Sequence, residues 1–167
     1  MSRDGAPLNA TAKGATISIA EAEAVDRNAL ARRLVAAGYR VSGDPSTAEL
    51  VARFAIDVGQ PHERTFERKI PEFERVERVE VINGEFVTFN EERFVGYFTE
   101  TFVETVYAAS ATLTVTRSDG SDDPVHVSRA QTEGICGNRA VLAPRLMDVL
   151  FDTPNGSTRR VEMPDCG

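Results

Sequence analysis

VEVINGEFVTF, residues Val79–Phe89, is the stretch that decides the fold of this chain. Asn83-Gly84 separates two short runs of β-forming residues, and both turn residues tolerate the positive φ that a type I′ turn demands. The stretch therefore predicts a β-hairpin. Because the surrounding segment Arg64–Phe102 follows a β pattern throughout, we expect a long β-hairpin insertion around residues 64–102.

Strands and two helices are expected on both sides of this turn. The apolar patterns predict strands at Ala15–Ala20, Tyr39–Ser42, Ala48–Val58, Phe94–Phe102, Thr105–Arg117, Val125–Thr132 and Thr158–Met163, and helices at Glu21–Ala37 and Val141–Phe151. Gly38 is the expected C-terminal cap of the first helix. Residues 1–13 are expected to be a flexible leader, and residues 14–167 a single domain. This order predicts an α+β fold, a two-layer sandwich with two helices packed on one face of a mainly antiparallel sheet.

Cys136 and Cys166 are the two cysteines of the chain, and they bracket the last helix and strand. A single pair placed to tie the C-terminus to the body suggests a disulfide and an oxidising compartment. Two free thiols in a cytosolic protein are the alternative. A nucleophilic pair of Cys136 with His126 is a third interpretation, for which we find no oxyanion loop and no third group.

Composition excludes several classes of function. The formal net charge of −7 argues against nucleic acid or an anionic membrane surface as a partner, since both need clustered Lys and Arg. Apolar residues make up 41% of the chain, enough for a real core. The sequence has neither a bilayer-spanning apolar run nor a signal peptide, so paired cysteines would imply a mature or trimmed form.

Signals for catalysis and metal binding are weak. His62 and His126 are the two histidines, and neither has a partner at metal-ligand spacing, so we expect no metal site. We find no nucleophile elbow and no phosphate-binding Gly-rich loop. The sequence therefore predicts a protein without a cofactor that is not an enzyme.

Two segments carry a family resemblance. The run LARRLVAAGYRVSGDPSTAELVARFAIDV, which starts at Leu30, resembles a segment typical of an uncharacterised family of small bacterial envelope lipoproteins. Gly38-Tyr39 and Ala48-Glu49-Leu50 occupy the family's helix end and strand start, with Glu where Asp is commoner. The run LAPRLMDVLFDTPNGSTRRVEMP is similar to the family's closing helix, turn and strand, although Thr153-Pro154 replaces its Phe-Pro.

The resemblance implies a periplasmic protein of the cell envelope that is tethered to a membrane through a lipid on an N-terminal cysteine. The outer membrane is one of the two membranes that could hold this tether. That cysteine would have been lost with a precursor segment. The family has no assigned catalytic residues to transfer, and the middle of the chain has no counterpart in it.

Aromatic residues concentrate in this middle segment, so we expect the functional surface to lie there. Most of them are expected to be core, but an exposed part would form an apolar interaction surface. The leading hypothesis is a non-enzymatic binding or assembly module that contacts an envelope protein through this hairpin or a sheet edge. The alternative is a small-molecule or lipid carrier with a pocket between helices and sheet. An enzyme of unrecognised type is a third possibility. The group consists of Phe86, Phe89, Phe94, Tyr97, Phe98 and Phe102.

Overall fold

The structure, a computed structural model, describes residues 5–8, 14–20, 22–121, 123–162 and 166. These residues divide into two compact units. The first contains residues 1–62 and 105–167, and the second contains residues 63–104. The elements are β1 (Thr16–Ile19), α1 (Ala24–Ala36), β2 (Arg40–Ser42), β3 (Leu50–Val58), β4 (His62–Ile82), β5 (Glu85–Arg117), β6 (Pro124–Gly134), α2 (Arg139–Phe151) and β7 (Thr158–Arg160).

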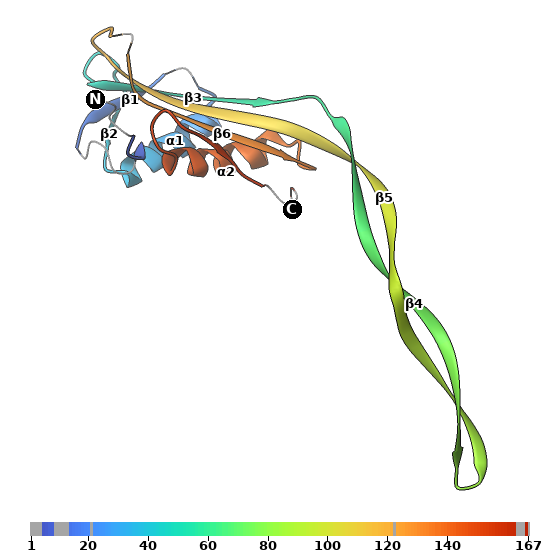
Figure 1. The fold of residues 1–167 in the computed structure, drawn as a ribbon. Helices are drawn as coiled ribbons and strands as arrows, with labels where there is room; N and C mark the ends of the chain where they lie inside the picture. The colour runs from blue at the N-terminus through green and yellow to red at the C-terminus, as the bar shows by residue number, and fades with distance from the viewer. Residues whose placement is uncertain (1–4, 9–13, 21, 122, 163–165, 167) are drawn as a thin grey trace. The chain divides into compact units, whose positions relative to one another are not determined.

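The first unit is built on a sheet with the strand order β2-β1-β3-β5-β6-β7. Pairs β1–β2, β1–β3 and β6–β7 are parallel, whereas β3–β5 and β5–β6 are antiparallel. The β1–β2 and β6–β7 pairs are parallel because α1 and α2 connect them, and strands joined through a helix run in the same direction. Both helices lie against one face of this sheet (Figure 1).

The expected fold class is wrong. The described residues are mostly strand and contain only two helices, and all seven strands belong to one mixed sheet. Two differences in the strands cause the error. The predicted strands Phe94–Phe102 and Thr105–Arg117 are parts of a single strand, β5, and the parallel pairs at both ends of the sheet make it mixed.

The core of the first unit lies between the helices and the sheet. Leu30 and Leu34 of α1 and Leu146 of α2 are fully buried in it, as are strand residues such as Leu113. Val25 of α1 is apolar but 74% exposed. Asp26, on the same helix, is buried.

Local signals set the ends of the helices. Gly38 has a φ of 96°, and the N–H of Tyr39 donates to the carbonyl of Leu34, which confirms the predicted glycine cap. Asn138 caps α2 by accepting a hydrogen bond from the N–H of Ala140. Pro144 lies inside α2, beyond its first turn, because the helix begins at Arg139 and not at Val141 as predicted.

The expected ends of the chain fall partly outside the described residues. Of the leader 1–13, residues 5–8 are described, and Leu8 among them is buried in the core. Glu21, the expected first residue of α1, and Met163, the expected last residue of the final strand, are not described.

Candidate functional site

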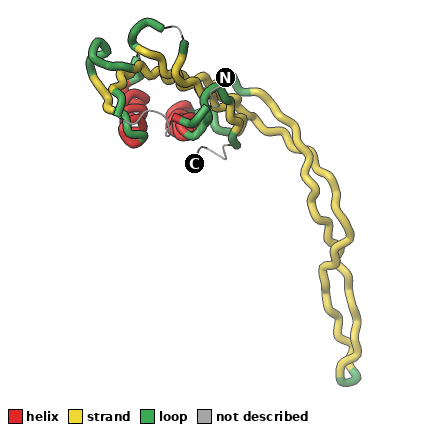
Figure 2. Tube along the Cα trace, turned by 60° about the vertical axis from the view of Figure 1, so that its left-hand side comes forward, coloured by secondary structure: helices red, strands yellow, loops and turns green. Residues whose placement is uncertain are grey.

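The second unit, residues 63–104, is a two-stranded ribbon made by β4 and the first part of β5 (Figure 2). Asn83 and Gly84 connect the strands, with φ angles of 54° and 85°. These positive values are the ones that a type I′ turn requires, so the predicted hairpin turn is confirmed. Strands joined by two residues run antiparallel. We call residues 63–104 the ribbon.

No side chain of the ribbon is buried, and all of its residues are described. Eleven of its large apolar side chains are exposed, among them Phe86 at 81% and Tyr97 at 64%. Soluble proteins seldom expose so many apolar side chains together unless they bind something. The eleven are Phe73, Val79, Val81, Ile82, Phe86, Phe89, Phe94, Val95, Tyr97, Phe98 and Val103.

The predicted aromatic group lies entirely on the ribbon. Five of its six members are exposed, and Phe102 is half-buried. The expectation that most of the group is core is therefore wrong. A two-stranded ribbon offers no second layer against which these rings could be buried.

Aromatic rings contact one another along the ribbon. In its middle, the ring of Phe94 lies 5.9 Å from Phe73 and 5.0 Å from Tyr97. The rings of Phe66 and Phe102 stack at 5.5 Å. Such pairs contribute about 0.5–1.5 kcal/mol each beyond the area they bury.

The Phe94–Tyr97 contact shows that β5 is irregular at this point. Residues three apart on a regular strand point to opposite faces, yet these two rings touch. Gly96, between them, has a φ of 155°. A local irregularity of this kind turns a side chain to the other face of a strand. It places Phe73, Phe94 and Tyr97 in one cluster, which we call the central cluster.

Charged side chains accompany the apolar ones. Arg93 of β5 pairs with Glu74 of β4 at 3.2 Å, and Arg78 lies 3.7 Å from Glu91. All four are more than half exposed, and exposed ion pairs contribute about 0–1 kcal/mol each. These pairs show which residues of β4 and β5 lie side by side, but they add little to the stability of the ribbon. A lone two-stranded hairpin is marginally stable in water.

Sequence reasoning missed Phe66 and Phe73 as members of this surface. Both lie in the highly charged segment His62–Glu80, which resembles a solvated face. The signal that could have found them is the recurrence of apolar residues in that segment, at Phe66, Ile70 and Phe73, but their spacing of four and three residues does not follow the two-residue period of a strand. A fully solvated face does not require those residues.

The cysteine pair forms a second predicted feature, in the first unit. Cys136 and Cys166 are joined by a disulfide with their Cα atoms 4.9 Å apart, as the sequence predicts. Cys136 is buried, so it holds the C-terminal segment against the core. Neither thiol is free to act as the nucleophile of a Cys136–His126 pair.

His126 is buried on the helix-covered face of β6. Burial lowers the pKa of its imidazole, because a charged ring would lose its hydration. Its Nε2 makes no hydrogen bond to a described residue. The other histidine, His62, lies 3.6 Å from a carboxylate oxygen of Glu133.

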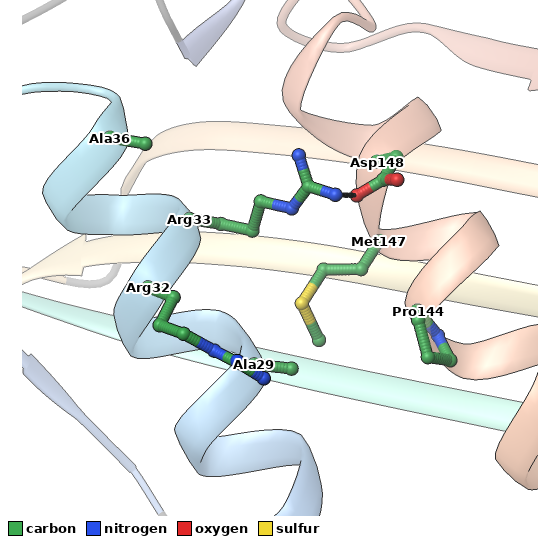
Figure 3. Close-up of a pocket in the computed structure, with 7 residues that line it drawn as sticks. All are labelled: Ala29, Arg32, Arg33, Ala36, Pro144, Met147 and Asp148. Atoms are coloured by element: carbon green, nitrogen blue, oxygen red, sulfur yellow. Dashed lines mark ion pairs between the residues drawn. The ribbon is translucent and has the colours of Figure 1, made fainter.

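A pocket of about 440 Å³ lies between α1 and α2 (Figure 3). Arg33 and Asp148 face each other across it as an ion pair, and Met147 and Pro144 line its α2 side. The described residues that line it all belong to α1 and α2, so the pocket lies between the helices and not between helices and sheet, where the carrier alternative places one. The arrangement favours a solvated groove, because charged side chains line it.

The described residues hold no group of three or more His, Cys, Asp or Glu side chains arranged to bind a metal ion. Among the described helices, neither is long and apolar enough to cross a membrane.

Comparisons of the chain with protein-family models, with curated proteins and with solved structures found no match.

Proposed function

We propose that the protein is a non-enzymatic binding or assembly module of the bacterial cell envelope, and that it binds a protein partner through the ribbon. The observation that carries this proposal is the set of large apolar side chains on residues 63–104, none of which is buried. Aromatic residues on exposed surfaces are the usual anchors of protein interfaces.

The ribbon is a better candidate than the sheet edges of the first unit. The edge strands β2 and β7 have three residues each, and short edges resist pairing with another chain. By contrast, β4 spans 21 residues, and all of them except His62 belong to the ribbon. Each ribbon strand has one described strand neighbour over residues 63–104, so its other edge can accept a partner's backbone.

The periplasm is the proposed compartment. Support comes from the disulfide, since such bonds persist in oxidising compartments, and from the resemblance to envelope lipoproteins. The resemblance adds a lipid tether to the membrane. The intact mass of the protein extracted from membranes tests that tether, because a lipid adds several hundred daltons.

Affinity capture from envelope extracts tests the ribbon. The variant Phe94→Asp/Phe98→Asp places two charges on the ribbon, and Val25→Asp/Val35→Asp places two on exposed positions of α1 as a matched control. We expect the wild type and the control to retain the same partner and the ribbon variant to lose it. A folded ribbon variant that keeps the partner would overturn the proposal.

A further inference from the structure

We propose that the partner is a second copy of this chain, and that two ribbons pack against each other antiparallel about a two-fold axis through the central cluster. This inference rests on the proposed function and names its partner. A two-fold contact uses the same surface on both copies and closes on itself, so it forms a dimer and no filament.

The exposed apolar area is sufficient for such a dimer. The six exposed aromatic side chains of the ribbon are on average about half exposed, which leaves roughly 650 Å² of aromatic surface in contact with water. The aliphatic side chains raise the total to about 1,000 Å². A standard interface takes about 800 Å² from each partner, of which about 450 Å² is apolar. Half of the ribbon's apolar surface is therefore enough.

The position of the central cluster favours an antiparallel arrangement. Phe73 lies near the middle of β4 (His62–Ile82), and Phe94 lies near the middle of the ribbon part of β5, residues 85–104. A two-fold axis through the ribbon's midpoint therefore places the cluster of one copy on the cluster of the other. Tyr97, which touches Phe94, would become buried at the centre, where interface hot spots occur.

Charge supports the same direction. The turn end of the ribbon, residues 77–92, carries five glutamates and one arginine, whereas the other end, residues 63–70 and 97–104, carries three basic and four acidic residues. A parallel arrangement would bring two acidic turn ends together, which is unfavourable. The antiparallel arrangement brings the strongly acidic turn end of each copy to the nearly neutral end of its partner, where Arg64, Arg68 and Lys69 lie.

Lys69 makes this arrangement measurable, because it is the only lysine in the ribbon. It lies four residues from Phe73, so its counterpart across the two-fold axis lies near Glu77 and Glu91. Within one ribbon these glutamates are seven or eight residues of strand away from Lys69, about 25 Å, which is beyond the reach of a zero-length cross-link. A Lys69–Glu77 or Lys69–Glu91 link must therefore join two copies.

The experiment mixes isotopically heavy and light protein, cross-links it with a carbodiimide and identifies the linked peptides. We expect heavy–light links from Lys69 to Glu77 or Glu91, and their loss in Lys69→Arg. Sedimentation at micromolar concentrations should show a dimer for the wild type and for Val25→Asp/Val35→Asp, and a monomer for Phe94→Asp/Tyr97→Asp.

The other outcomes of this experiment distinguish failure of the second-copy inference from failure of the proposed function. A wild-type monomer, or a dimer that the ribbon substitutions leave intact, would overturn the second-copy inference. If a monomeric wild type still captures another protein through its ribbon, the proposed function stands and only the identity of the partner is wrong. If the ribbon variant changes no association at all, both proposals are wrong.

Discussion

Reduction of the Cys136–Cys166 disulfide should destabilise the first unit by a predictable amount. The bond closes a loop with a sequence separation of 30 residues. In the chain-entropy account, a loop of this length restricts the unfolded chain by about 3.6 kcal/mol at 25 °C. Cys136 is buried in the core and Cys166 is exposed, so the bond ties the C-terminal end of the chain to the core. We therefore expect about 3.6 kcal/mol less unfolding free energy in the reduced protein.

Urea unfolding with and without a reductant measures this difference. At a typical slope of about 2 kcal/mol per M, the midpoint should fall by about 1.8 M on reduction. The variant Cys136→Ala/Cys166→Ala is the control, since its midpoint should be low and independent of the reductant. A loss below about 1 kcal/mol on reduction would refute the view that this bond secures the C-terminal segment.

Three further predictions concern the first unit. The lowered pKa of buried His126 means that the unfolded chain binds a proton more readily than the folded one. The unfolding free energy should therefore fall as the pH drops below about 6.5, by up to about 1.4 kcal/mol per pH unit, and His126→Leu should flatten this slope in chemical denaturation. Gly137→Ala should cost roughly 1–3 kcal/mol in the same assay, because its Cβ would lie 2.6 Å from the ring of Tyr107. Arg139→Ala should lower the unfolding free energy by about 1–2 kcal/mol, since Arg139 donates at 2.6 Å to the nearly buried carboxylate of Asp26 but is itself partly exposed. An unchanged melting temperature would contradict this prediction.

Signals confined to a few residues predicted local structure well. Asn83-Gly84 predicted the hairpin turn because few residues adopt its positive φ angles, and Gly38 predicted the helix end for the same reason. The positions of Cys136 and Cys166 predicted the disulfide, since the expected helix and strand between them leave few other roles for the pair.

The extent of β5 could not be predicted in the same way. Its ribbon part has no buried face, so the alternation of apolar and polar residues that marks a strand is weak there. Val103 and Glu104 separate the strands predicted at Phe94–Phe102 and Thr105–Arg117, although β5 continues through both residues. The sheet's parallel pairs were predictable in principle, because a strand, a helix and a strand in succession favour a parallel crossover. This pattern occurs at β1, α1 and β2 and again at β6, α2 and β7.

The exposure of the aromatic group could not be predicted from composition alone. The same residues would form a core if another layer covered them, and whether a layer does so depends on contacts between distant parts of the chain. The structure has no such layer among the described residues of the ribbon. What the sequence could indicate was the concentration of rings between Phe86 and Phe102.

Removal of the ribbon tests the central claim most directly. In this variant an Asn-Gly turn joins His62 to Thr105 in place of residues 63–104. Every residue of the apolar core lies outside that segment, so we expect the shortened chain to fold, form its disulfide and unfold at the same urea concentration as the wild type. Sedimentation and affinity capture should then show that it has lost the association of the full chain. A shortened chain that associates as strongly as the wild type would contradict the account.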